Sequence, residues 1–423
     1  MPDRPNVLFV LTDQMRAEAM GCMGDPNVHT PTLDTMAEEG VLCTRNYSPD
    51  PVCTPARASI LTGQYPHTHR TITNNFRLPE DSTTVADVLA AEGYETGYIG
   101  KWHLDGTPKP GHVPPGDRRQ GFSYWKGFNR GHEHLDGHPH FDDEGTVEWE
   151  EGYQPELQAD MAMEFMGEHA GEDPFFCYLS WGPPHLPYAA PEEYEAMYDA
   201  DDLTLRENVS DRMADQARRD LVPYYGMITS LDDQMERLLA FLEEEGIRDE
   251  TIVVFTSDHG EQIGSQDCYY KSYPYEESVH VPLIWQYPDG LPAGAERDEL
   301  VSLVDLMPTL LSMCDAEVPA GVQGEDISGV LAAGDSLDRP GVYIEDNVGD
   351  DDEWRAFRTA EHMLVVDRYG DEQYFWNTAD DPYQQHNLAD IVHDKQDLER
   401  YLVDAAKEYD DRYFLNQIGE RAN

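Results

Sequence analysis

The segment Asn6-Val7-Leu8-Phe9-Val10-Leu11-Thr12-Asp13-Gln14 begins with a run of apolar residues and ends in two polar ones. The uninterrupted run Val7–Leu11 is typical of a strand in the middle of a parallel sheet, because both faces of such a strand are covered. The polar residues that follow then lie at the carboxyl edge of the sheet, where open α/β sheets hold their ligands. The segment therefore predicts both a sheet and the edge at which a site would lie.

Strands and helices alternate along the first three quarters of the chain. Further strands are expected at residues 94–99, 175–181, 251–256 and 282–286, and helices at residues 32–39, 56–62, 84–92 and 212–245. This alternation favours an α/β fold with a mainly parallel sheet sandwiched by helices.

The pattern changes after about residue 338. Four short, hairpin-like strands are expected at residues 341–345, 354–359, 362–367 and 372–376, followed by a helix at about 394–409. We therefore expect a main domain over residues 1–337 and a small α+β subdomain with an antiparallel sheet over residues 338–423.

The segment Cys53-Thr54-Pro55-Ala56-Arg57 places a thiol where a helix should begin. Pro55 suits the first helical position, Thr54 is a plausible cap, and Gly63 suits the end of the helix. Cys53 would then lie at the positive end of a helix dipole, and Arg57 could turn back toward the same point. The pattern predicts a nucleophile beside an anion site, although a buried structural cysteine before an ordinary helix is the alternative.

Polar residues directly follow two of the expected strands. Asp13 and Gln14 follow the first strand, and Asp258 and His259 follow the strand at residues 251–256. Two carboxylates, one amide oxygen and one imidazole suit a divalent ion such as Ca²⁺, Mg²⁺ or Mn²⁺. Each residue alone could serve as a cap or turn residue, but beside Cys53 they predict a metal site.

Four more side chains are candidates for the same edge of the sheet. Lys101 and His103 follow the strand at residues 94–99, and His185 follows the strand at residues 175–181. Lys271 lies in a Tyr-Tyr-Lys-Ser-Tyr segment and is one of only six lysines in the chain. The alternatives are a surface lysine and ordinary loop histidines.

In this order, the segments resemble the sulfatase family of the alkaline phosphatase superfamily. The matching segments are residues 6–14, 51–63, 100–104, 184–188, 256–261, 271–278 with 281–284, and 304–311. The family's C-terminal D-P-x-x-x-x-N-L signature has its counterpart in residues 381–388. The resemblance spans almost the whole chain, and it implies an alkaline-phosphatase-like fold whose catalytic domain is the main domain.

The resemblance also implies a specific chemistry, the hydrolysis of a small-molecule or carbohydrate sulfate ester to alcohol and sulfate. A separate formylglycine-generating enzyme would oxidise Cys53 to formylglycine, whose hydrated aldehyde is the nucleophile. One divalent metal ion would act as a Lewis acid. Its ligands would be Asp13, Gln14, Asp258, His259 and residue 53.

Roles for five further residues follow from the same resemblance. Arg57 and Lys101 would orient the gem-diol and neutralise charge. His103 would take up the proton in the elimination step. His185 and Lys271 would bind the sulfate and help the leaving alcohol to depart.

One departure from the family pattern keeps alternatives open. Many sulfatases carry two consecutive Asp residues where this chain has Asp13-Gln14, a pair that also resembles phosphonate monoester hydrolases and choline-sulfatase-like members. We expect Ca²⁺ first, with Mn²⁺ or Mg²⁺ as alternatives. A phosphonate monoester or phosphodiester hydrolase is the first alternative function, and a non-catalytic binding protein with an unconverted Cys53 is the second. A two-metal phosphatase is disfavoured, and Asp305 is expected to cap a helix.

Residues 104–155 are rich in Gly, Pro, His and aromatic residues and show no clear period, so we expect a long loop at the mouth of the pocket. Aromatic rings there could stack on a sugar, and arginines could pair with a carboxylate or a second sulfate. The histidines could instead bind a second metal. The candidates are Arg118, Arg119, Trp125, Phe128, Arg130, His132, His134, His138 and His140.

The charge of the chain is extreme, with 84 acidic against 29 basic residues and a net charge of −55. The acidic residues are spread along the whole sequence, and 39% hydrophobic residues can build a core, so a disordered acidic protein is excluded. This pattern favours adaptation to high salt and a halophilic organism, because the Debye length falls to about 3 Å at 1 M salt. A surface of this sign repels phosphate, so we do not expect a nucleic-acid partner.

The six cysteines form no C-x-x-C pair and are expected to be mostly buried thiols in a reducing compartment. Residues 1–6 lead directly into the first strand without a signal-peptide pattern, and no run approaches the roughly 20 apolar residues of a membrane span. We therefore expect a cytoplasmic protein with no membrane partner.

The charge pattern predicts that folding and activity require molar salt, because only then is the self-repulsion of the acidic surface screened. Circular dichroism across a salt series measures this dependence directly. Full stability in dilute buffer would contradict the prediction.

Overall fold

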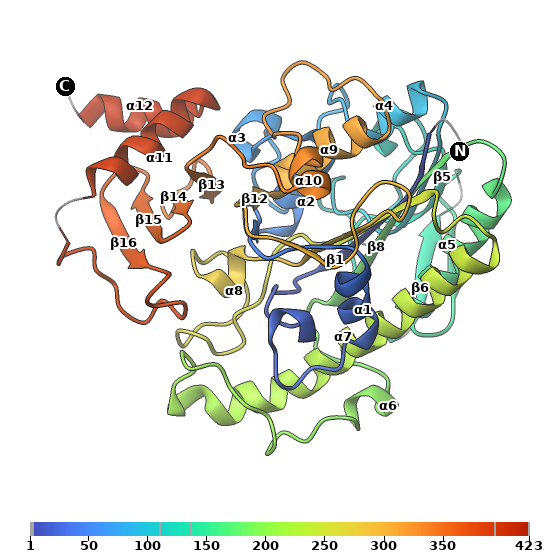
Figure 1. Ribbon diagram of the computed structural model, residues 1–423, viewed down its shortest axis with the longest axis horizontal. Helices are drawn as coiled ribbons and strands as arrows, with labels where there is room; N and C mark the ends of the chain where they lie inside the picture. The colour runs from blue at the N-terminus through green and yellow to red at the C-terminus, as the bar shows by residue number, and fades with distance from the viewer. Residues whose placement is uncertain (1–3, 110, 136, 142, 393–394, 422–423) are drawn as a thin grey trace.

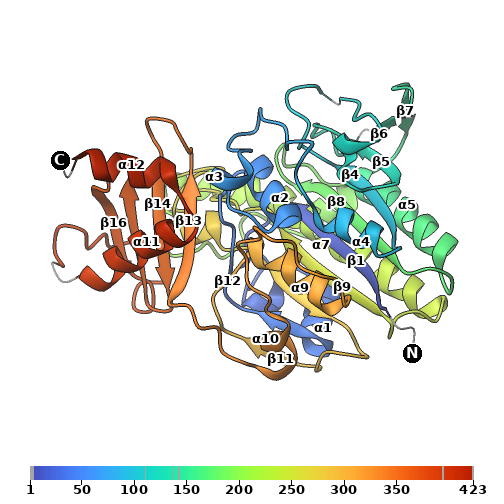
Figure 2. The ribbon, with the colours of Figure 1, turned by 90° about the horizontal axis from the view of Figure 1, so that it is seen from above.

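The computed structural model describes residues 4–109, 111–135, 137–141, 143–392 and 395–421. At its centre is an eight-stranded sheet with helices on both faces (Figure 1, Figure 2). In spatial order the strands are β11 (Ala295–Arg297), β2 (Val41–Cys43), β10 (Leu283–Gln286), β9 (Thr251–Ser257), β1 (Asn6–Asp13), β8 (Phe175–Pro184), β4 (Glu95–Lys101) and β5 (Tyr124–Phe128).

Five neighbouring strands of this sheet, β9, β1, β8, β4 and β5, run parallel to one another. Strand β10 is antiparallel to both of its neighbours, β9 and β2, so the expected strand at residues 282–286 exists but reverses direction. The expected mainly parallel sheet is confirmed. Strand β1 lies at its centre, and all of its apolar residues are buried.

Two groups of helices cover the two faces. On one face α1 (Pro31–Glu39), α5 (Gln154–His169) and α7 (Asp211–Glu244) pack on Leu8 and Val10 of β1. On the other face α2 (Cys53–Thr62), α4 (Val85–Ala91), α9 (Leu306–Met313) and α10 (Ser328–Ala333) pack on Val7, Phe9 and Leu11. Because successive side chains of β1 point to opposite faces of the sheet, this strand contributes apolar residues to both cores.

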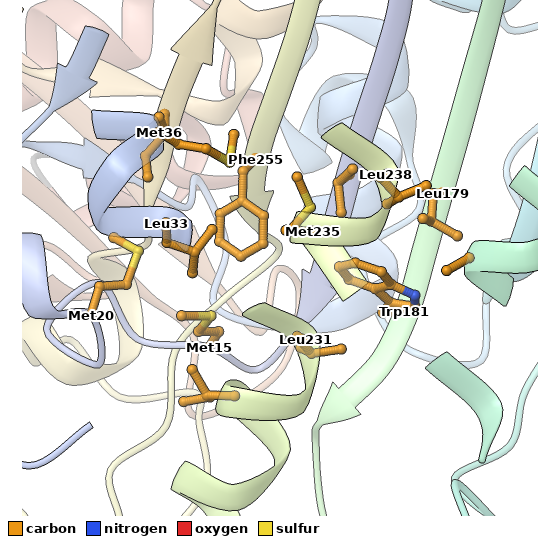
Figure 3. Packing of buried hydrophobic residues seen from close by; sticks show 14 of the residues in the cluster. Met15, Met20, Leu33, Met36, Leu179, Trp181, Leu231, Met235, Leu238 and Phe255 are labelled. Atoms are coloured by element: carbon orange, nitrogen blue, oxygen red, sulfur yellow. The ribbon is translucent and has the colours of Figure 1, made fainter. Parts of the chain in front are cut away.

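Figure 3 shows the first of these cores at close range. Leu231, Met235 and Leu238 of α7 lie against Phe255 of β9 and Trp181 of β8. Methionines fill much of this layer; their unbranched, flexible side chains adapt to irregular gaps between a helix and a twisted sheet.

The C-terminal part of the chain forms a separate four-stranded antiparallel sheet (Figure 1). Its strands are β13 (Gly341–Asp346), β14 (Trp354–Thr359), β15 (His362–Asp367) and β16 (Glu372–Asn377), all within one residue of their expected positions. One face packs on α11 (Gln396–Glu408) and α12 (Arg412–Arg421), and the other contacts Tyr47 and Val279 of the main body. Asp394, where the closing helix was expected to begin, lies outside the described residues, and the division at residue 337 stays a prediction.

The expectation of an irregular loop over residues 104–155 is wrong. This region contains η2 (Asp117–Arg119), the edge strand β5, and a hairpin formed by β6 (His138–Phe141) and β7 (Val147–Glu150). Edge and hairpin strands bury only part of their surface and carry Gly and His, so they lack the apolar signal of a central strand. Helix α5 was not expected from the sequence, whereas α9 begins directly after Asp305, where a helix was expected.

The start of α2 differs from its expected position. The helix begins at Cys53 itself, with Val52 as the N-cap residue and Pro55 in the third position. Thr54 is therefore not a cap, and its hydroxyl instead donates to the carbonyl of His103 at 2.8 Å. The expected end is confirmed, because Gly63 adopts a left-handed conformation with φ 63°.

Shorter elements connect these layers: η1 (Gly21–Met23), β3 (Asn46–Tyr47), α3 (Pro66–His69), α6 (Glu192–Glu195), α8 (Glu276–Val279), β12 (Val301–Ser302) and η3 (Leu303–Asp305).

No helix in the described part of the chain combines the length and apolar composition that a membrane span needs.

The carboxyl ends of four adjacent parallel strands meet at one edge of the large sheet. Strand β1 ends at Asp13, β9 leads into Asp258, β4 ends at Lys101, and β8 leads into His185. Helix α2 begins at the same edge. The fold thus brings together residues from widely separated parts of the sequence.

Gly100 has a steric role in bringing β4 against β8 just before Lys101. Its φ is 102°, and an added Cβ would lie 2.0 Å from the carbonyl oxygen of Ser180. We predict that Gly100→Ala costs at least about 3 kcal/mol, the sum of backbone strain and a backbone clash.

Gly106→Ala is the matched control. Gly106 also has a positive φ, 75°, but the nearest atom to its added Cβ lies 3.7 Å away, so only strain of about 1 kcal/mol is expected. Equilibrium urea unfolding at fixed salt measures the loss of unfolding free energy in both variants. Equal losses for the two variants would contradict the steric role.

Candidate functional site

Cys53 lies in a buried cluster of metal-binding side chains. The ligand atoms of Asp13, Cys53, Asp258 and His259 all lie within 4.8 Å of one another. The Cys53 sulfur is 3.2 Å from His259 Nε2 and 3.7 Å from Asp13 Oδ1. His259 Nε2 is 3.6 Å from an oxygen of each carboxylate, so four donors from three elements surround one point.

The orientation of His259 suits metal binding. Its Nδ1 lies 3.0 Å from the carbonyl oxygen of Gly260 and, as the protonated nitrogen, donates to it. This hydrogen bond leaves the lone pair of Nε2 facing the cluster, which is the arrangement that metal-bound histidines require.

Gln14 lies beside this cluster in a left-handed backbone conformation, with φ 69°. Its backbone N–H donates to Asp258 at 3.1 Å, and its side-chain oxygen accepts from Lys271 at 2.7 Å. The amide nitrogen bonds to Glu261, which fixes the direction of the amide. Glu261 was not among the site residues expected from the sequence, although it ends the polar segment that follows β9.

Three cations surround the acidic groups. Arg57 donates to Asp258 at 2.8 Å and to Asp13 at 3.2 Å, and Lys101 forms an ion pair with Asp13. Lys271 Nζ lies 3.1 Å from the Cys53 sulfur. All the predicted residues around Cys53 are therefore brought together except the two histidines described next.

These charges shift the ionisation of the site. Burial alone would raise the pKa of Asp13, but Lys101 and Arg57 hold that pKa well below its usual value. Burial and the Asp13 charge oppose ionisation of the Cys53 thiol, yet Lys271 and the other cations lower its pKa. Position 53 is thus an environment that stabilises negative charge.

His103 and His185 lie at the rim of the cluster and do not enter it. Neither ring nitrogen of the buried His103 has a hydrogen-bond partner among the described residues. His185 Nδ1 lies 2.6 Å from the carbonyl oxygen of Leu186, and its ring stacks on that of His132 at 3.9 Å. Burial, together with nearby Lys101 for His103 and Lys271 for His185, holds the pKa of each well below 6.5, so both are neutral bases.

The candidates from residues 104–155 separate into two groups. Only Arg130, His132 and His134 line a cavity, of about 550 Å³, beside the site. The others are structural: Arg118 pairs with Asp105, Arg119 with Asp143, and His140 with Glu148, while Trp125, Phe128 and His138 are buried. In the described part of the chain none of these histidines belongs to a group that could hold a metal ion.

Asp305 takes part in helix capping, but not as the cap residue that was expected: it is the third residue of η3, whose cap is Ser302, and its side chain makes no capping hydrogen bond to α9. Its carboxylate accepts the backbone N–H of Ser302 at 2.8 Å in a capping box and also pairs with Arg339 at 2.5 Å. Both contacts lie outside the Cys53 cluster, so no second metal position follows from it.

Comparison with known proteins decides which family the site represents. The sulfatase family model matches residues 5–316, and a model of the C-terminal part of N-sulphoglucosamine sulphohydrolase matches residues 264–408. The chain belongs to the sulfatase family.

Several relatives of this sulfatase match it over most of their length. An ulvan-active sulfatase from Formosa agariphila is 37% identical over 92% of this chain and 77% of its own. An endo-4-O-sulfatase from Bacteroides thetaiotaomicron is 28% identical over 98% of this chain and 94% of its own. The crystal structure of a putative sulfatase, yidJ, from Bacteroides fragilis superposes with a TM-score of 0.92 at 29% identity, covering 98% of both chains.

The protein is a sulfuric ester hydrolase with the alkaline-phosphatase-like fold. The match to the sulfatase family model and the sulfatases among its relatives favour sulfate-ester hydrolysis over the phosphonate and binding-protein alternatives. The family generally uses a divalent metal and formylglycine, and the Cys53 cluster contains a donor set that fits such an ion.

Arg57 holds the two buried carboxylates of this sulfatase together. We predict that Arg57→Met destabilises the metal-free protein by about 3–5 kcal/mol, because Asp13 and Asp258 would remain buried with a main partner removed. Equilibrium unfolding by denaturant at fixed salt measures this loss.

Arg400→Met is the control, since Arg400 pairs with Asp397 at 2.8 Å on the exposed surface of α11. A loss of less than about 1 kcal/mol is expected there. If Arg57→Met cost no more than the control, the carboxylates would not depend on the guanidinium.

Proposed function

We propose that this sulfatase hydrolyses sulfate esters of carbohydrates, using a formylglycine made from Cys53 and one divalent metal ion. The observation that carries the proposal is the position of Cys53 Sγ, which belongs to the metal-binding group and lies 3.1 Å from the ammonium of Lys271. The carbohydrate part is supported by relatives named N-acetylglucosamine-6-O-sulfatase and endo-4-O-sulfatase.

The proposed metal ligands are Asp13, Gln14, Asp258, His259 and residue 53. Their donor set is rich in oxygen with one imidazole, which suits Ca²⁺ first and Mn²⁺ or Mg²⁺ as alternatives. The ammonium of Lys271 bonds to Gln14 and Cys53. Bound there, the ion would supply Lewis acidity to the sulfate oxygens.

The surrounding side chains divide the remaining tasks. The hydrated formylglycine supplies the nucleophilic hydroxyl. Arg57 and Lys101 hold the residue 53 side chain and balance its charge, and Lys271 and His185 bind the sulfate group as charge develops on the leaving oxygen. His103 accepts a proton, since both of its ring nitrogens are without partners in the described structure.

Maturation would require a formylglycine-generating enzyme as a partner. Cys53 is 1% exposed, so that enzyme would have to reach the segment before the chain folds. A cytoplasmic location and a halophilic source are part of the same proposal. The six free cysteines support a reducing compartment, and the net charge of −55 supports a halophilic source.

The conversion of Cys53 has a mass signature. We predict that peptide mass spectrometry of the native protein finds residue 53 about 18 Da lighter than cysteine, because a thiol is replaced by an aldehyde. Cys53→Ala should abolish turnover of an aryl sulfate while leaving the fold intact.

Cys314→Ala is the matched control, since Cys314 is equally buried but lies in the hydrophobic core at the C-terminal end of α9. It should retain activity. An unconverted thiol at residue 53 in active native protein would contradict the mechanism, and a higher kcat/KM for an aryl phosphonate ester than for the aryl sulfate would contradict the substrate class.

A further inference from the structure

A cavity of about 550 Å³ opens directly beside the catalytic cluster. His132, on its wall, stacks on His185 at 3.9 Å with the rings only 7° from parallel. The Nε2 atom of His134, which also lines the cavity, lies 3.0 Å from the carbonyl oxygen of His185. A substrate whose sulfate reaches His185 would therefore extend into this cavity.

The wall contains two cations that are not neutralised. Arg130 and Lys109 both line the cavity, and neither forms an ion pair with any residue in the described ranges. In a chain with 84 acidic residues, unpaired cations at one cavity are informative. The single carboxylate among the described lining residues is that of Glu133, which accepts the N–H of His132 at 3.2 Å.

Arg130 is held in place but keeps donors available. One terminal nitrogen donates to Asn75 at 3.2 Å, and this is its only hydrogen bond to a described residue. Its Nε is buried without a partner. A buried, unpaired donor on a guanidinium costs free energy unless a ligand or water accepts from it.

The histidines do not supply this positive charge. Burial lowers the pKa of His132 to about 2, with a further contribution from Lys101, and burial also lowers the pKa of His134. Both rings are therefore neutral near pH 7, and the permanent charge of the wall comes from Arg130 and Lys109.

Another part of the cavity lining is apolar and aromatic. Trp149 of the β6–β7 hairpin lines the cavity with 49% of its surface exposed, next to Leu135 and Pro139. An exposed indole face beside fixed charges suits the apolar face of a sugar ring whose substituents are anionic.

We propose that Arg130 and Lys109 bind a second anionic group, a carboxylate or a further sulfate, on the sugar whose sulfate ester is cleaved at residue 53. This inference rests on the proposed function and adds the substrate feature that the cavity selects. Arg130 makes the main contact, because a guanidinium can bind a carboxylate or sulfate through two parallel hydrogen bonds.

The test compares Arg130→Gln with the unchanged enzyme, at the salt concentration in which the enzyme is folded. The substrates are 4-nitrophenyl sulfate, a neutral sugar monosulfate, the corresponding sulfated uronate and the corresponding disulfate. We expect kcat/KM to fall about 10- to 100-fold for substrates with a second anion, mainly through KM, and less than about twofold for the other two.

Three further variants sharpen the result. Arg130→Lys should lose less than Arg130→Gln, because charge remains but the two-pronged contact is lost. Lys109→Gln should lower kcat/KM for the same substrates as Arg130→Gln. Lys407→Gln, on the exposed surface of α11, should change nothing. The comparison of uronate with disulfate identifies which anion the cavity prefers.

Loss of kcat/KM on all four substrates would make Arg130 a structural residue and overturn the inference. Unchanged kcat/KM values on all four substrates would overturn it too. Calorimetric binding to Cys53→Ala separates this from the proposed function. If no sulfate is hydrolysed but anionic sugar sulfates bind in an Arg130-dependent manner, the proposed function fails and the inference stands. If sulfates are hydrolysed and this binding does not depend on Arg130, the proposed function stands and the inference fails.

Discussion

One buried guanidinium joins most of the elements that form the site. Arg57 extends from α2 to Asp13 at the end of β1 and to Asp258 after β9. It also donates to the carbonyl of Lys101 on β4 at 2.9 Å and to the hydroxyl of Ser180 on β8 at 2.7 Å. Two carboxylates excluded from water would repel each other strongly at low dielectric, so the edge of the sheet depends on this cation and on Lys101.

The same constraint explains why position 53 stabilises negative charge. The cations that stabilise Asp13 also lower the pKa of the Cys53 thiol, and Lys271 contacts both that sulfur and Gln14. Outside the site the chain is overwhelmingly acidic, with a net charge of −55. Charges at the buried cluster are screened by salt much less than charges on the surface, so local cations can act on an anionic substrate despite the overall charge.

The elements that the sequence predicts well are those with an unambiguous physical signal. Strands β1 and β9 carry continuous apolar runs, Val7–Leu11 and Ile252–Phe255, because both of their faces are covered, and the four strands of the small sheet are separated by short connections. Strand β5 and the β6–β7 hairpin were missed because these short strands mix polar and apolar residues and contain no continuous apolar run. Helix α5 was missed because its apolar face, which includes Ala159, Ala162 and Met166, is built largely from small and flexible residues.

By itself the sequence determined which residues gather around Cys53, because polar residues at strand ends and a cysteine at a helix start have few other uses in combination. Asp13, Asp258, His259 and Arg57 do converge. Only the tertiary structure decided that Gln14 is oriented by Glu261, that Thr54 is not a cap, and that Arg130 rather than Arg118 or Arg119 faces the cavity. These outcomes depend on which side chains meet across the fold, and the spacing of residues along a chain does not contain that information.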